Sequence, residues 1–237
     1  MANTYSLDLE AGTSDYAYIT DTVSLSITGD MTIEFWYKPE SAPATDTNQS
    51  LISKYTGVGN QRSYRAFYQD SAGTKRLVFQ VSSDGTAITD GLFNYTLTPG
   101  TWYHLAFVYT ASTGTVEMYV NTSSIGTDAT LATSVYNGTA NFQIGQDPDG
   151  QADGLIDDVR VWNDIRSGAE ITANYQTELT GTEANLQGYW KCNEGSGTNL
   201  NDETANANDL TIGGSGTFSS NVPFVEAVVN KSYAYFM

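Results

Sequence analysis

Residues 142–171 read FQIGQDPDGQADGLIDDVRVWNDIRSGAEI, and this stretch combines three local patterns. Asp147, Asp149 and Asp153 fall within seven residues of a loop that glycines interrupt. Crowded carboxylates in a flexible loop repel one another unless a cation or water lies between them, so calcium is the first ligand to consider. The following run, GLIDDVRVW, reads as a strand. The Ser-x-x-Glu pattern at Ser167 is a capping box, which predicts one short helix near 167–175.

Period-two alternation of apolar and polar residues extends the pattern outward from this stretch. It predicts strands at 32–37, 76–81 and 115–120, each with one buried face. Between residues 104–109 and the last of these strands lies TASTG, whose Gly114 can take the positive φ that a hairpin turn requires. Turn signals such as DSAGT, SSDGT, TPGT and GGSGT recur at strand-length intervals. We therefore expect an all-β protein, an antiparallel two-sheet jelly-roll β-sandwich.

Composition narrows the range of partners. The chain has 237 residues, of which 40% are hydrophobic and 12% aromatic, enough to bury a core. A formal net charge of −17, with only 10 Lys and Arg, argues against nucleic-acid binding, because phosphates would be repelled over most of the surface. Anionic membranes are disfavoured for the same reason. The same acidity raises the local concentration of cations, although it also describes an ordinary solvated acidic surface.

The N-terminal residues show no sign of an export signal. The first ten residues, MANTYSLDLE, lack both a basic region and an apolar region, so no Sec signal peptide is visible. No apolar run of 18 residues predicts a membrane-spanning helix. Cys192 is the only cysteine, so no intrachain disulfide can form, and its alternating context GYWKCN predicts a buried, inert thiol.

Five stretches together resemble the laminin-G-like, concanavalin A-like lectin and glucanase domains, which include the pentraxins. They are SLDLEAGTSDYAYI, MTIEFWYKPES, TWYHLAFVYTASTGTVEMYVN, GLIDDVRVWNDIRSGAEI and GYWKCNEGSGTNLNDETANANDL. They cover nearly the whole chain in the order that the family shows. The resemblance implies one jelly-roll domain over residues 1–224. Residues 225–237 form an apolar tail that we expect to add a strand or to contact another subunit or virion protein.

The resemblance also implies calcium at two places. GQDPD resembles the pentraxin calcium loop, in which Asp147 and Asp149 would supply carboxylates and Pro148 its carbonyl. Gln151 or Asp153 would complete that shell. The related glucanases imply a second, structural site. There Asp157 would bind calcium together with carbonyls of the Glu10–Gly12 turn, or would simply accept hydrogen bonds from backbone amides.

Carbohydrate recognition requires aromatic faces and planar polar groups. The loop from Tyr55 to Tyr64 offers both, and VYNGT lies where it could face that loop. The candidate ligand-binding residues are Tyr55, Asn60, Gln61, Arg62, Tyr64, Tyr136 and Asn137. Tyrosine and asparagine are also ordinary turn and surface residues, so a purely structural role stays open.

Catalysis has weaker support in the sequence. The glucanases of this fold use a Glu-x-Asp-x-x-Glu motif, because retaining hydrolysis needs two carboxyls about 5 Å apart. This chain lacks the motif, and its nearest approach is Asp8-Leu9-Glu10. His104, the only histidine, lies in an expected core strand without a nucleophile elbow, which favours a structural role.

These patterns favour a non-catalytic recognition module, supported by calcium, with a glycan as its ligand. The competing hypothesis is an architectural virion or cell-surface protein, such as a capsid decoration, fibre or adhesin subunit. Such a protein would assemble through its tail, and a homo-oligomer would be one such assembly. A polysaccharide hydrolase or lyase is a remote third. All three suit an extracellular or virion-surface location. A trimmed leader, another secretion route or release by lysis would account for the missing signal peptide.

Overall fold

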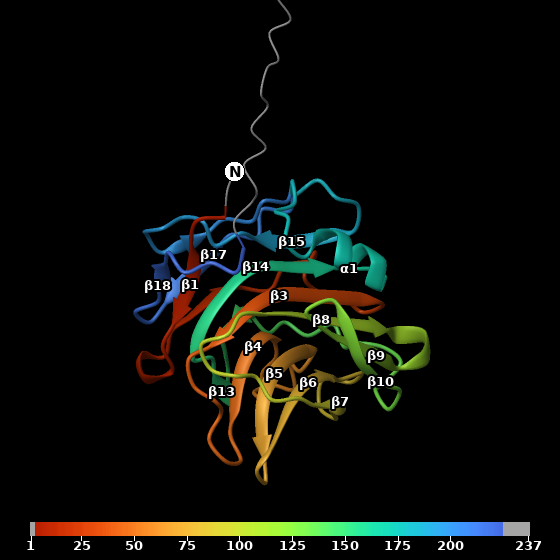
Figure 1. Ribbon diagram of the computed structural model, residues 1–237. Helices are drawn as coiled ribbons and strands as arrows, with labels where there is room; N and C mark the ends of the chain where they lie inside the picture. Colours follow the sequence, from red (N-terminus) through yellow and green to blue (C-terminus); the bar gives the residue numbers. More distant parts are fainter. Residues whose placement is uncertain (1–2, 225–237) are drawn as a thin grey trace, which may run out of the picture.

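The computed structural model describes residues 3–224, and these form two antiparallel β-sheets packed face to face (Figure 1). The only α-helix of the described part is α1 (Gly168–Asn174). Two 3₁₀ turns, Ala11–Thr13 and Ala111–Thr113, follow strands. The prediction of an all-β jelly-roll sandwich with one short helix is confirmed. The tail predicted at 225–237 lies outside the described residues.

Sheet A contains eight of the described strands, in the order β10-β9-β8-β3-β14-β1-β18, with β15 also paired to β14. It brings the first strand of the chain beside strands from its second half. Its members are β1 (Ser6–Leu9), β3 (Met31–Pro39), β8 (Tyr103–Thr110), β9 (Thr115–Val120), β10 (Ser123–Asp128), β14 (Gly154–Trp162), β15 (Leu186–Trp190) and β18 (Thr217–Ser219).

Sheet B has the order β16-β17-β2-β11-β4-β5-β6-β7, and the short pair β12 and β13 joins it through a parallel bridge to β4. The half of the sheet that ends at the β7 edge is a meander from β4 to β7. Its members are β2 (Tyr16–Ile19), β4 (Asn48–Lys54), β5 (Tyr64–Ser71), β6 (Thr74–Val81), β7 (Thr89–Asn94), β11 (Phe142–Ile144), β12 (Gln146–Asp147), β13 (Gly150–Gln151), β16 (Asn199–Leu200) and β17 (Leu210–Gly213).

The core lies between the two sheets and is rich in aromatic rings. Phe79 of β6 stacks on Phe107 of β8 with ring centroids 5.7 Å apart. Phe142 of β11 stacks on Trp190 of β15 at 5.1 Å. Aromatic pairs at such distances add to the free energy of burying their large apolar surfaces, so these two stacks join the sheets at separate points. Cys192 is buried in this core as predicted, and burial raises the pKa of its thiol.

The predicted local elements are confirmed at two sites. Ser167 caps α1: its hydroxyl accepts from the amide of Glu170, whose carboxylate in turn accepts from the amide of Ser167. The predicted hairpin is β8–β9, and Gly114 between them has a φ of 61°. A Cβ at Gly114 would come within 2.2 Å of the carbonyl oxygen of Leu131, so the turn also needs glycine for space.

The prediction of one buried face per strand is wrong for the middle of sheet A, and also for β6 of sheet B, where residues 77–81 are all buried. All nine residues of β14 are buried, and in β3 only Lys38 is partly exposed. The reason in sheet A is a second layer over its outer face, where Ile171 of α1 packs on Ala106 and Val108 of β8. Figure 1 shows α1 beside β14 and β3.

Charged side chains lie beneath this second layer. Arg160 lies 2.6 Å from the Asp158 carboxylate and 3.5 Å from that of Glu34, and all three side chains are buried. Nε2 of His104 lies 3.4 Å from the other oxygen of Glu34. Arg160 also donates to carbonyls at the end of α1 and just after it. His104 therefore belongs to a buried polar network that docks the helix, as its predicted structural role requires.

The described residues contain no helix long and apolar enough to cross a membrane.

Candidate functional site

The predicted calcium loop is folded around an arginine. β12 and β13 form a two-residue hairpin that brings Asp147 and Asp149 over the outer face of sheet B. Nη1 of Arg65, on β5, lies 2.9 Å from Oδ2 of Asp147 and 2.7 Å from Oδ2 of Asp149. The other oxygen of Asp147 accepts from the amide of Asp149 at 2.7 Å. Both oxygens of Asp147 are thus engaged by groups of the protein itself.

The hairpin separates two grooves. One, of about 650 Å³, is lined by Asp147, Pro148, Asp149, Gln151 and Asp153 together with residues 41–44 and 47–49. The other, of about 420 Å³, is lined by the same Pro148 and by Tyr55, Gln143 and Gln146. The structure therefore brings the predicted calcium loop and the first residue of the predicted ligand loop to one surface, where Gln146, Asp147 and Pro148 line both grooves.

Asp153 does not join the other two aspartates of the loop at Arg65. Its carboxylate accepts hydrogen bonds from the hydroxyl of Ser41 and, at 3.5 Å, from the amide of Ala11. Its carbonyl accepts from the hydroxyl of Tyr37 at 3.1 Å. Asp153 thus ties the end of β3 to the turn after β1, and its carboxylate lies near enough to Glu40 to raise the pKa of that residue.

Three carboxylates meet at that end of sheet A. Ligand oxygens of Asp8, Glu10 and Glu40 all lie within 4.8 Å of one another. Burial and the nearby charge of Asp15 raise the pKa of Asp8, while burial and the charges of Asp8, Glu10 and Asp153 raise that of Glu40. One oxygen of Asp8 is buried without a hydrogen-bond partner among the described residues. These three residues are a donor set that could hold a divalent cation.

The predicted grouping of Asp157 with Glu10 and Gly12 is wrong. The strand register places Leu9 opposite Gly154, so the Glu10–Gly12 turn lies about 10 Å along β14 from Asp157. Asp157 is fully buried, and Oδ2 accepts from Nδ2 of Asn3 at 2.9 Å while Oδ1 has no partner among the described residues. Burial, and then the charge of Asp158, raise the pKa of Asp157 well above its usual range.

Two tyrosines of the predicted ligand loop belong to the structure rather than to a ligand surface. Tyr64 is 0% exposed and donates to the carbonyl of Leu25 at 2.8 Å, so the prediction that it contacts a ligand is wrong. Its position at the start of β5 turns the ring into the core. Tyr55 is 6% exposed, and the guanidinium of Arg65 covers one face of its ring at 4.0 Å from the centroid.

The remaining residues of the predicted ligand-binding set do come together. The backbone oxygen of Asn60 and the ring of Tyr136 both lie against Gly85, and Oε1 of Gln61 accepts from the amide of Thr139 at 2.7 Å. Arg62 donates to the hydroxyl of Tyr55 and to the carbonyl of Thr86. Asn137 is exposed beside this contact. Several polar groups of the loop are thereby already paired within the protein, and the side-chain amides of Asn60 and Asn137 are exposed.

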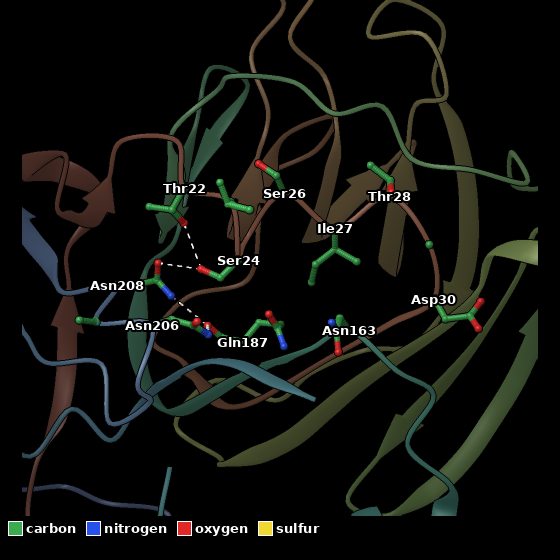
Figure 2. Close-up of a pocket in the computed structure, with 13 residues that line it drawn as sticks. Thr22, Ser24, Ser26, Ile27, Thr28, Asp30, Asn163, Gln187, Asn206 and Asn208 are labelled. Carbon is green, nitrogen blue, oxygen red and sulfur yellow. Dashed lines mark hydrogen bonds between the residues drawn. The ribbon is translucent and has the colours of Figure 1, made fainter. Parts of the chain in front are cut away.

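A third groove, which sequence reasoning missed, is lined mainly by hydroxyl and amide side chains (Figure 2). It has a volume of about 740 Å³. One wall is the 22–30 segment, with the hydroxyls of Thr22, Ser24, Ser26 and Thr28; the other carries the side-chain amides of Asn163, Gln187, Asn206 and Asn208. The side-chain amides of Asn163 and Gln187 have no hydrogen-bond partner among residues 3–224. Asp30 is the only charged residue of the lining.

The amide wall is held rigid from behind. Oδ2 of Asp202 accepts from both the backbone amide and Nδ2 of Asn208, at 2.8 and 3.0 Å, and Oδ1 accepts from the amide of Tyr189. Nδ2 groups of Asn206 and Asn208 donate to the carbonyl of Gln187, at 3.0 and 2.9 Å. Ser24 joins the two walls by donating to Oδ1 of Asn208 at 3.0 Å. A ligand would meet Asn206 and Asn208 already held in place.

The sequence contained one signal of this groove, the run NDETANAND at 201–209. Asparagine and aspartate in such a run are also the usual residues of turns, so the run alone does not distinguish recognition from turn formation. Asn163 and Gln187 come from distant segments, and only the pairing of β14 with β15 places them on one side of the groove.

Comparison with known proteins identifies the fold. Residues 11–172 match the family model of the concanavalin A-like lectin/glucanases superfamily, which is more than half of the chain. The chain belongs to this superfamily. A search of curated proteins found no match.

Solved structures agree with membership of the superfamily. A protein of Bacteroides ovatus to which carbohydrate binding is attributed has a TM-score of 0.71 at 16% identity; the match covers 96% of this chain and 62% of that protein, so this chain spans less than two thirds of it. A heptameric SAP-like pentraxin from Limulus polyphemus has a TM-score of 0.54 at 17% identity, covering 72% of this chain and 81% of the pentraxin.

A third similar structure was solved with a sugar bound. It is domain 4 of an extracellular arabinanase from Geobacillus stearothermophilus in complex with arabinotriose, with a TM-score of 0.50 at 22% identity, covering 66% of this chain and 71% of the domain. At identities below 25% these similarities establish the superfamily fold and leave function to be argued from the site.

Proposed function

We propose that this chain is a non-catalytic carbohydrate-binding module that holds a neutral oligosaccharide in the groove between the 22–30 segment and the amides of Asn163, Gln187, Asn206 and Asn208. One observation carries this proposal. The side-chain amides of Asn163 and Gln187 line a polar groove and have no hydrogen-bond partner among the described residues. Sugar hydroxyls both donate and accept, as do amides, so each free amide can bind a hydroxyl in both directions.

Among the described residues, the groove lining has no second carboxylate. This supports binding of a sugar over its cleavage. Hydrolysis of a glycosidic bond uses two carboxyl groups on either side of the bond, whereas Asp30 is the only acidic residue of this lining. Glu34 and Asp158 lie in the buried network under α1 and do not reach the groove. The similar protein of Bacteroides ovatus, to which carbohydrate binding is attributed, and the arabinanase domain that holds arabinotriose support the same class of ligand.

Calcium forms a separate part of this proposal, assigned to Asp8, Glu10 and Glu40. A divalent cation would relieve the repulsion that contributes to the raised pKa values of Asp8 and Glu40. Hard oxygen ligands suit calcium. In Glu40→Gln we expect calcium binding at this cluster to fall below detection by isothermal titration calorimetry. If Glu40→Gln leaves the heat of calcium binding unchanged, the assignment of calcium to this cluster is wrong. The proposed glycan groove lies elsewhere on the molecule, so that result would not affect it.

The test of the function is a glycan array on the purified chain, run in millimolar calcium and in chelator, followed by calorimetry with the best ligand. The double variant Asn163→Ala with Gln187→Ala should bind roughly tenfold or more weakly, because two hydrogen bonds of about 1 kcal/mol each are lost. Asn137→Ala, which removes an exposed amide from the other candidate surface, is the matched control. Loss of binding in Asn137→Ala alone would move the site to the 55–64 loop.

A further inference from the structure

The loop that resembles a calcium site already contains a positive charge. Arg65 is 4% exposed, and its Nη1 donates to Oδ2 of Asp147 and Oδ2 of Asp149 at 2.9 and 2.7 Å. This one nitrogen therefore contacts both carboxylates that the resemblance assigns to a metal. We propose that the guanidinium of Arg65 takes the place of calcium in this loop, so that Asp147 and Asp149 are held together without a metal ion.

The arginine is fixed on every side. Its guanidinium lies 4.0 Å from the ring centroid of Tyr55 and 4.6 Å from that of Phe67. Nε donates to Oε1 of Gln80 at 2.8 Å. Alternation along β5 accounts for this position, because Tyr64 and Ala66 point into the core while Arg65 and Phe67 point to the outer face. Guanidinium planes stack on aromatic rings and pair with carboxylates, so the surroundings suit arginine specifically.

Arg65 also supplies a charge partner for the buried carboxylate of this loop. Burial alone would lower the pKa of Arg65. The charge of Asp147, the nearby Tyr55 and the hydrogen bonds to Asp147 and Asp149 together outweigh burial and raise the pKa. Asp147 is almost completely buried, with a side-chain exposure of 1%, and Asp149 is half exposed at 47%. A buried carboxylate requires a partner, and here arginine supplies it. A calcium ion bound by the same two oxygens would have to displace a buried guanidinium or lie against it, and two positive charges at that distance repel each other.

This replacement has a consequence for the neighbouring grooves. Pro148 lines both the 650 and the 420 Å³ groove, and the hairpin that carries it is fixed by Arg65. The shape of this surface should therefore be the same in calcium and in chelator. A metal-dependent loop would instead open on chelation and change both grooves.

The experiment isolates this loop from the Asp8–Glu10–Glu40 cluster by using a Glu40→Gln background. In that chain we expect no calcium heat by calorimetry and the same melting temperature in calcium chloride and in EGTA. Adding Arg65→Gln removes the cation and leaves the oxygens of Asp147, Asp149 and Gln80. The double variant should melt at a lower temperature in EGTA and recover by several degrees in calcium chloride but not in magnesium chloride.

The matched control is Arg62→Gln in the same background. Arg62 also lies near the ring of Tyr55, but donates to the hydroxyl of Tyr55 and the carbonyl of Thr86 instead of to a carboxylate, so this variant should gain no calcium response. A calcium-dependent rise in the melting temperature of the Glu40→Gln chain that Asp147→Asn removes would overturn the proposal. So would a folded Arg65→Gln variant that does not respond to calcium. If Arg65→Gln does not fold, the calorimetry and melting of the Glu40→Gln chain decide the question alone.

Discussion

Nε1 of Trp162 donates a 3.0 Å hydrogen bond to Oε1 of Glu34, so a buried indole and a buried carboxylate from neighbouring strands share one contact beneath α1. Burial alone would raise the pKa of Glu34. The charge of Arg160 and the contacts of His104 and Trp162 outweigh it and lower the pKa of Glu34 to about 2. The folded protein therefore keeps this carboxylate ionised at a pH where the unfolded chain has bound a proton.

The first prediction concerns acid stability. Because the pKa of Glu34 is lowered on folding, its stabilisation is fully present above pH 4.5 and is lost as the pH falls from 4.5 to about 2. Glu34→Gln should cost about 3 kcal/mol at pH 7, since it removes one partner of a buried ion pair. The difference from wild type should shrink between pH 4.5 and 2, as measured by urea unfolding. Glu117→Gln, a carboxylate with a surface hydrogen bond, is the control. A constant difference across this range would contradict the mechanism.

The second prediction has the opposite sign. Burial and the charge of Asp158 raise the pKa of Asp157, so its contribution to stability is present at low pH and is lost as the pH rises above the unfolded value near 3.8. Asp157→Asn keeps the shape and removes the charge, so it should raise the melting temperature by a few degrees at pH 8 and have little effect at pH 4. An equal shift at both pH values, in scanning calorimetry, would show that packing and not ionisation is responsible.

The third prediction separates Tyr64 from ligand binding. Tyr64→Phe removes the hydrogen bond to the buried carbonyl of Leu25 and should cost about 1 kcal/mol of unfolding free energy. Its glycan affinity should equal that of the wild-type protein. If Tyr64→Phe keeps wild-type stability but binds glycan more weakly, Tyr64 contacts the ligand and this prediction is wrong.

The fourth prediction concerns the support behind the groove. Asp202→Ala leaves the amides of Tyr189, Thr204 and Asn208 without an acceptor and should cost about 2 kcal/mol or more. Glycan affinity should fall with it, because Asn208 loses its orientation. In contrast, the Asn163→Ala with Gln187→Ala variant should keep the wild-type melting temperature and lose only affinity. Thr211→Ala, on the exposed side of β17, should change neither quantity.

The sequence predicts those features that depend on short-range order. The Ser167 capping box and the glycine of the β8–β9 turn are each decided by a few neighbouring residues, and both are confirmed. The sandwich also follows from period-two alternation and closely spaced turns. The buried outer face of sheet A does not, because Glu34 and Arg160 look like solvent-facing positions of an alternating strand until the layer over them is known.

The candidate site was less predictable, for the same physical reason. Asp147 and Asp149 are close to each other in sequence, but Arg65 comes from a different strand, and only the sheet brings its charge between them. Tyr64 and Arg65 differ by one position and therefore point to opposite faces. A register that sequence alone does not fix thus decides which of the two reaches the loop.

The docking of α1 has a consequence for motion. A seven-residue helix is too short to be stable alone, and α1 is held through carbonyls near its end: Arg160 donates to Asn174 and Thr177, and Trp36 donates to Tyr175. If α1 opened locally, the buried indole of Trp36 would lose its acceptor, and the buried guanidinium of Arg160 would lose two carbonyl acceptors. The helix should therefore open only together with sheet A. In native-state hydrogen exchange, its amides should report the global unfolding free energy despite their place at the surface.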